Sequence, residues 1–137
     1  MAANVVTDLS QIAQILELDV QTVVRRVALD LHKRIVEKTP VDTGRARASW
    51  TLNPGRPDRS VAPEDTQLSA EAATQTALAQ QAKAATTKPY EAIWLSNNVV
   101  YITQLESGSS QQAPAGMVAV SLAEIETELQ AIINTSQ

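Results

Sequence analysis

The chain has 137 residues, with 11 Lys and Arg against 15 Asp and Glu, so its formal net charge is −4. This length predicts one domain over residues 1–137, and the negative charge argues against DNA binding through overall electrostatic attraction. The absence of cysteine excludes disulfides and thiol chemistry, and the single histidine, His32, excludes a multi-histidine metal site.

The first part of the chain is predicted to be helical. Apolar residues recur at helical spacing over 9–16 after Asp8, which can serve as an N-cap. A stronger pattern follows Asp19, another N-cap residue, and one helix face is traced by Val20, Val23, Val24, Val27, Leu31 and Ile35. Pro40 disfavours helical geometry in the residue before it, so the long helix is expected to end by residue 39.

A turn and a strand are predicted next. Residues 40–44 read PVDTG, in which the proline fixes one dihedral, the aspartate can accept backbone hydrogen bonds and the glycine permits a positive φ. Residues 45–52 alternate between small or apolar side chains and polar ones. This alternation predicts a half-buried strand whose outer face is basic because of Arg45 and Arg47.

The middle of the chain has an unusual composition. Residues 53–63 hold three prolines and a glycine, so no regular structure is expected there, and residues 66–88 are rich in Ala, Gln and Thr. Alanine favours a helix, but Leu68 and Leu78 are the only large aliphatic residues of this stretch available for burial. We therefore expect residues 53–88 to form a projecting loop or insertion with a marginal helix.

The last part is predicted to be a small packed unit. Residues 92–95 read AIWL and predict a strand buried on both faces. Residues 107–116 form a loop rich in Gly, Ser and Gln, and residues 121–124 can form a capping box for a terminal helix. The apolar face of that helix is predicted to comprise Leu122, Ile125, Leu129, Ile132 and Ile133.

These elements predict an α+β fold. A long N-terminal helix and a C-terminal helix would pack on a small, mainly antiparallel sheet, with the Ala- and Pro-rich segment inserted. The chain has only 2 Trp and 2 Tyr and no Phe. We expect Tyr101 and Trp94 to anchor the core beside Trp50, and the thin core suggests stability shared with neighbouring subunits.

No pattern typical of catalysis or cofactor binding is present. His32 lies within the long predicted helix and is expected to be structural or on the surface rather than a base. Glu124, Glu126 and Glu128 are spaced two apart, so they point in different directions on a helix and predict a solvated face. The stretch after Glu106 lacks the glycines and the lysine of a phosphate-binding loop. The sequence therefore predicts neither an enzyme nor a metal or cofactor site.

Charge is distributed unevenly along the chain. Residues 25–59 hold nine bases and four acids, a balance of 9 − 4 = +5, whereas residues 106–137 hold four acids and no base. This separation is compatible with chance, with DNA contact through the basic stretch, or with a positive face of one subunit that meets a negative face of the next. The candidate interface residues are Arg45, Arg47, Glu124 and Glu128.

Two motifs carry a resemblance to a known family. Residues 39–50 read TPVDTGRARASW, and residues 96–118 read SNNVVYITQLESGSSQQAPAGMV. In order and spacing they resemble segments of tailed-bacteriophage neck and tail-completion proteins, often described as minor tail protein Z-like. Ala46 stands where that family usually has Leu, and Ile102 where it usually has Ala. Residues 53–88 have no counterpart that we can assign.

The resemblance implies a structural role in the virion. The protein would form a ring, expected to be a hexamer, at the head-proximal end of the tail, and it would join tail to head around a channel through which DNA passes without sequence-specific binding. Its partners would be copies of itself and other neck and tail proteins, such as the terminator, the adaptor or head-closure proteins, and the portal side. The motif residues with structural demands are Pro40, Asp42, Thr43, Gly44, Tyr101, Glu106, Gly108, Pro114 and Gly116.

Three alternatives and a location complete the expectations. The chain could instead be a head-closure adaptor bound to the portal, a DNA-binding module that uses residues 25–59, or, least expected, a virion hydrolase dependent on His32 or Glu106. No apolar run approaches the ~20 residues of a membrane helix, and no signal peptide is evident. We expect assembly in the host cytoplasm and a final location in the neck of the virion, with no membrane contact.

Overall fold

The computed structural model describes residues 8–136, which form a mainly helical α+β fold with six α-helices and a two-stranded antiparallel sheet. The helices are α1 (Leu9–Leu16), α2 (Val20–Lys38), α3 (Arg45–Ala48), α4 (Ala70–Leu78), α5 (Ile102–Glu106) and α6 (Val118–Thr135), and a 3₁₀ segment, η1 (Ala79–Thr86), continues α4. The strands are β1 (Thr51–Pro54) and β2 (Ile93–Ser96).

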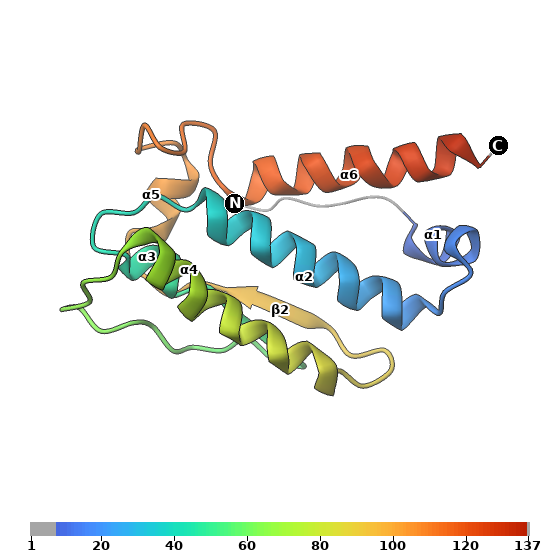
Figure 1. The fold of residues 1–137 in the computed structure, drawn as a ribbon, viewed down its shortest axis with the longest axis horizontal. Coiled ribbons are helices and arrows are strands. Elements are labelled where there is room, and N and C mark those ends of the chain that lie inside the picture. Colours follow the sequence, from blue (N-terminus) through green and yellow to red (C-terminus); the bar gives the residue numbers. More distant parts are fainter. Residues whose placement is uncertain (1–7, 137) are drawn as a thin grey trace.

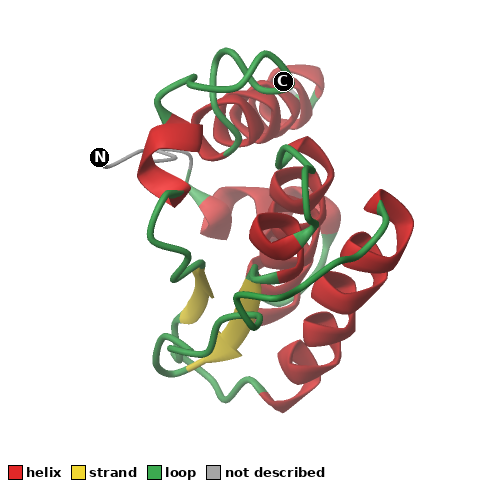
Figure 2. Cartoon of the chain, turned by 90° about the vertical axis from the view of Figure 1, so that its left-hand side faces the viewer, coloured by secondary structure: helices red, strands yellow, loops and turns green. Residues whose placement is uncertain are grey.

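Helix α2 is the central element of the fold. Helix α6 lies along one side of it, and the sheet and α4 lie on the other, while α1 packs at the end where α2 begins (Figure 1). The N-terminal and C-terminal helices therefore contact each other, and α6 covers the helices rather than the sheet. Figure 2 shows the small sheet at the side of the helical layers.

The predicted start and end of α2 are confirmed. The Asp19 carboxylate accepts a hydrogen bond from the Thr22 N–H at 2.9 Å, which satisfies one of the unpaired donors at the helix start. The helix ends at Lys38 because Thr39, which precedes Pro40, has an extended backbone with ψ of 125°. The predicted helix over 9–16 is confirmed as well, and Asp8 caps it through the Ser10 N–H.

The predicted strand over 45–52 is wrong in its first half, because residues 45–48 form α3. Its alternation came from Ala46 and Ala48, which are small and have high helix propensity, so they are buried as readily in a helical turn as in a strand. The strand begins only at Thr51, and it pairs with β2 in the register Thr51↔Ser96 to Pro54↔Ile93. The expectation of no regular structure from residue 53 onward is wrong for its first two residues.

Residues 70–86 of the middle segment are packed against the body of the protein. Ala73 and Ala77 of α4 are fully buried, and α4 contacts α2 and α3 while η1 contacts β1. Small side chains let two helix backbones approach closely, so a helix face of alanines can be buried without large apolar residues. The expectation of a projecting loop therefore fails for residues 70–86.

The core consists of two apolar clusters. One surrounds Val36 and Trp50 with the start of α6, and the other joins α1, α2 and α6 around Ile12 and Ile125; Leu31 borders both. Trp50 is only 6% exposed, but Trp94 and Tyr101 are 44% and 38% exposed, so the expected aromatic core is wrong for these two. In β2, Trp94 is exposed and its neighbours are partly exposed, so the predicted burial on both faces is also wrong.

Candidate functional site

The two sequence motifs meet in space through Gln112 and Val41. The Gln112 side-chain amide accepts a hydrogen bond from the Val41 N–H at 2.9 Å and donates one to the Val41 carbonyl at 3.2 Å. A second contact joins them where the Asn97 amide donates to the Ala46 carbonyl at 2.8 Å. Segments that are 51 to 71 residues apart in the chain thus form one surface, which is our candidate functional site.

A hollow of about 460 Å³ lies between the two motifs, and we call it the motif pocket. Its walls combine the 40–46 turn with parts of α5 and of the loop after it. The lining residues are Pro40, Val41, Asp42, Thr43, Gly44, Arg45, Ala46, Glu64, Tyr101, Leu105, Ser110 and Gln112. The pocket therefore holds two carboxylates, one guanidinium and one partly exposed phenol ring.

The turn at the base of the motif pocket depends on Gly44. Its φ is +85°, and a Cβ at this position would lie 2.7 Å from the Leu68 carbonyl oxygen, so the predicted need for glycine is confirmed. The Thr43 hydroxyl oxygen accepts a hydrogen bond from the Arg45 N–H at 3.3 Å. Among the described residues, the Asp42 carboxylate accepts no hydrogen bond, so its expected part in the turn is wrong.

Glu106 has a role that sequence reasoning missed. Its carboxylate accepts hydrogen bonds from the N–H groups of Met117 and Val118 at 2.8 Å and of Ala119 at 3.0 Å, which are the first donors of α6. A negative charge there also opposes the positive end of the helix dipole. Because this cap comes from α5 and α6 begins at Val118, the predicted local capping box at 121–124 is wrong.

The glycines of the second motif keep room for this cap. A Cβ at Gly116, where φ is +88°, would collide with the Glu106 carbonyl oxygen and would lie 2.8 Å from the Glu106 carboxylate. A Cβ at Gly108 would likewise collide with the carbonyl oxygen of Pro114. The Pro114 side chain is exposed. Glu106, Gly108 and Gly116 therefore act together to fix the start of α6.

Arg45 and Arg47, expected on an outer basic face, make contacts within the chain. Arg47 donates to the carbonyls of Glu37 and Thr39 at 3.1 and 3.0 Å, so it caps the C-terminal end of α2. It also reaches the Thr74 hydroxyl at 3.2 Å and so ties α2 to α4. Burial lowers the pKa of the Arg47 guanidinium. Arg45 donates to the Ala62 carbonyl at 2.9 Å.

Glu124 and Glu128 also make their ion pairs within the chain. Lys38 lies 2.7 Å from Glu124, and Arg34 lies 2.6 Å from Glu128 and 2.9 Å from Asp30, so this network joins α6 to α2. The hydrogen bond from Lys38 lowers the pKa of the Glu124 carboxyl, and the carboxylates around Arg34 raise the pKa of its guanidinium. The charge separation seen in the sequence thus serves contacts between helices of one chain.

His32 is a buried structural residue, as expected. Its Nε2 lies 3.2 Å from the Trp50 carbonyl oxygen, and its Nδ1 lies 3.1 Å from the Gln81 amide nitrogen. Because the Trp50 carbonyl only accepts, Nε2 carries a proton, and because the Gln81 amide nitrogen only donates, Nδ1 is the acceptor, so the ring is neutral. Burial lowers the pKa of His32, which opposes protonation. The His32 side chain itself is fully buried.

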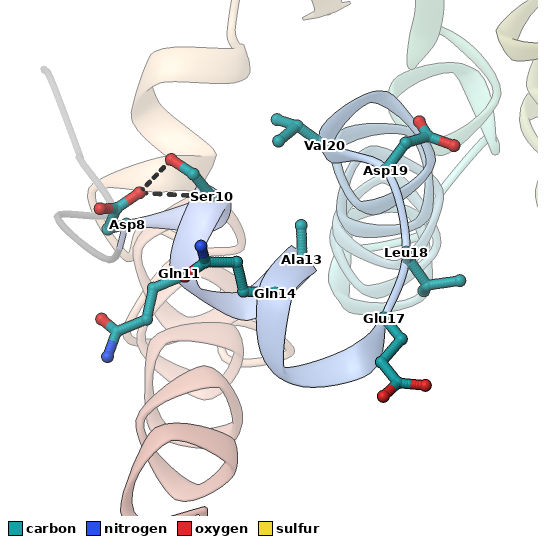
Figure 3. Close-up of a pocket in the computed structure, with 9 residues that line it drawn as sticks. All are labelled: Asp8, Ser10, Gln11, Ala13, Gln14, Glu17, Leu18, Asp19 and Val20. Carbon is teal, nitrogen blue, oxygen red and sulfur yellow. Dashed lines mark hydrogen bonds between the residues drawn. The ribbon is translucent and has the colours of Figure 1, made fainter.

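A second hollow, of about 660 Å³, lies in the corner between α1 and α2 (Figure 3). Three carboxylates border it, but Asp8 and Asp19 are the N-caps of α1 and α2. Over residues 8–136, no group of three or more His, Cys, Asp or Glu residues is placed to hold a metal ion. Within the same range, no helix has the length and apolar character needed to cross a membrane.

Comparisons with known proteins returned no relatives. No protein-family model, no curated protein and no solved structure matches the chain.

Proposed function

We propose that the protein is a structural component of the neck of a tailed bacteriophage. It would be a tail-completion protein that forms a homo-oligomeric ring at the head-proximal end of the tail and joins tail to head around the DNA channel. The alternative within the same setting is a head-closure adaptor bound to the portal. The proposal rests on the resemblance of residues 39–50 and 96–118 to that family, together with the contacts these residues make.

The observation that carries the proposal is the joining of the two motifs by Gln112 and Val41. Three motif side chains form hydrogen bonds with backbone groups of the chain: Gln112 binds a peptide group, Glu106 caps α6 and Arg47 caps α2. A side chain whose polar atoms bind the backbone helps to fix the shape of the surface on which it lies. Large apolar residues beside this surface, Val100 and Tyr101, are 85% and 38% exposed, which favours contact with other proteins.

Deletion of the gene in the phage that encodes this protein tests the proposal. A neck component is expected to leave filled heads and complete tails unattached in the lysate, and added purified protein should restore joined, infectious particles. Joined particles of normal infectivity without the protein would overturn the proposal. Heads that lose their DNA would indicate the head-closure alternative instead.

A further inference from the structure

Within residues 8–136, the side chains of four arginines of the basic stretch make no hydrogen bond or ion pair: Arg25 and Arg26 lie on α2, and Arg56 and Arg59 lie together in one loop. Arg34 and Lys38 bind carboxylates of α6, and Arg45 and Arg47 bind carbonyls. Within residues 8–136, the guanidinium groups of Arg56 and Arg59 have neither a hydrogen-bond partner nor an ion-pair partner. Both lie in the exposed loop formed by residues 55–60, which we call the arginine loop.

The arginine loop is held in one shape by four side chains. The Asn53 amide donates to the Arg56 carbonyl at 2.7 Å, and the Asn98 amide donates to the Asp58 carbonyl at 2.9 Å. Lys83 lies 3.1 Å from the Asp58 carboxylate, which also accepts from Ser60 at 2.8 Å. The hydrogen bonds from Ser60 and Lys83 lower the pKa of Asp58 to about 2, so this carboxyl is ionised at neutral pH and pairs with Lys83. The Glu91 carboxylate lies beside Gly55 at the start of the loop, but it forms no ion pair with Arg56 or Arg59.

The motif pocket offers the complementary chemistry. Asp42 and Glu64 line it, both side chains are exposed, and neither carboxylate has a partner among the described residues. The partly exposed ring of Tyr101 forms another part of the wall. Arg45 also lines the pocket, where its Nε donates to the Ala62 carbonyl at 2.9 Å. A guanidinium binds carboxylates through paired donors and stacks on aromatic faces, so the two carboxylates and the phenol ring suit an arginine side chain from outside.

We propose that the arginine loop of one copy binds in the motif pocket of a second copy. This inference rests on the proposed function, because it names the partner surface within the ring. Loop and pocket are different surfaces of the chain, so the contact is heterologous and each copy can use both, which generates a ring if the rotation closes. This contact replaces the interface predicted from sequence, because the four side chains of that interface make hydrogen bonds or ion pairs within the chain. They are Arg45, Arg47, Glu124 and Glu128.

Duplex DNA is the competing ligand for two exposed arginines. The second copy is favoured because the chain itself carries the acidic and aromatic counterpart, and its net charge of −4 opposes an approach to phosphates. A contact between oppositely charged groups on two copies should weaken as salt rises.

Paired charge reversals test the contact. The loop variant, Arg56→Glu with Arg59→Glu, keeps an intact pocket, and the pocket variant, Asp42→Lys with Glu64→Lys, keeps an intact loop. Each alone should associate more than about tenfold more weakly than the wild type in analytical ultracentrifugation at low salt. Mixed together, they should restore association, because the normal loop of the pocket variant meets the normal pocket of the loop variant, and the reversed loop meets the reversed pocket with complementary charge.

A control variant, Arg26→Glu with Lys88→Glu, changes the net charge by the same amount as the loop variant and should associate like the wild type. Thermal melting and circular dichroism establish that each variant is folded. The proposal is overturned if the wild type stays monomeric at its solubility limit, if either variant associates like the wild type, or if the mixture forms no complex. Loss of duplex DNA binding in the loop variant with unchanged association would assign the loop to DNA.

Failure of this contact can be distinguished from failure of the proposed function. If the protein associates through the arginine loop and the motif pocket but is not needed to join heads to tails, the proposed contact stands and the proposed function is rejected. If the protein is needed to join heads to tails but its two variants do not complement each other, the proposed function stands and the proposed contact is rejected.

Discussion

The side-chain amide of Gln112 lies against the peptide group of Val41 and makes both a donor and an acceptor hydrogen bond to it, at 3.2 and 2.9 Å. An amide side chain carries a donor and an acceptor side by side, so it can pair with both halves of a backbone residue, as a neighbouring strand would. The pair fixes the loop after α5 to the turn after α2. The shape of the motif pocket therefore depends on it.

Replacement of this glutamine tests that dependence. Gln112→Ala removes two hydrogen bonds of an exposed side chain and should lower the free energy of unfolding by about 1–2 kcal/mol. Gln111→Ala is the matched control, because Gln111 is its exposed neighbour and makes no hydrogen bond that involves the turn. Urea denaturation of both variants measures the difference. Equal stability of the two would show that the pairing contributes nothing.

The Glu106 cap leads to a second prediction. Glu106→Ala leaves three N–H groups at the start of α6 without their acceptor and should cost about 1–3 kcal/mol. Glu106→Gln keeps one oxygen acceptor and should fall between the alanine variant and the wild type. Glu64→Ala, which removes an exposed carboxylate, is the control. A Glu106→Ala protein as stable as this control would contradict the assignment.

Burial of His32 predicts a pH dependence. The unfolded chain has a histidine pKa of about 6.5, whereas in the folded protein the pKa is lower. Below the unfolded pKa the unfolded state binds a proton that the native state does not, so stability should fall as the pH drops from 7 toward the native pKa, by at most about 1.4 kcal/mol per pH unit. The stability contributed by Glu124 and Asp58, whose pKa values are lowered, is lost only at more acid pH.

Denaturation at about pH 7.5 and about pH 5.0 measures this slope. The His32→Gln variant should lose most of it, because glutamine does not titrate and can still donate to the Trp50 carbonyl. A slope that persists unchanged in the variant would assign the titration to other groups.

The packing of α4 provides a fourth prediction. Ala77→Leu inserts three carbons where α4 meets the core and should destabilise the protein by about 1–3 kcal/mol through overpacking. Ala70→Leu, at an exposed position of the same helix, should have little effect. Thermal melting distinguishes a packed α4 from a projecting one, for which both substitutions would be equally mild.

The parts of the fold that could be predicted from sequence are local. Helix α2 follows from its apolar spacing, from Asp19 at its start and from Pro40 after its end, all within about twenty residues. The turn at Gly44 is predictable for the same reason. Residues 45–48 show the limit, because the alternation of alanine and arginine fits both a short helix and a strand, and packing against α4 decides between them.

The motifs could be found in the sequence, but the contacts between them could not. The partners of the motif side chains lie far along the chain: Gln112 binds Val41, and Asn97 binds Ala46. Charge separation between the halves of the chain predicts attraction without indicating whether it acts within one copy or between copies. For Glu124 and Glu128, the structure shows that it acts within one.

The central claim is that this chain is a building block of the phage neck, and its position in purified particles tests that claim most directly. Electron microscopy of particles labelled with gold-conjugated antibodies against the protein should place the label at the junction between head and tail. Label that is absent from the particles, with the protein recovered only as a free species in the lysate, would contradict the claim.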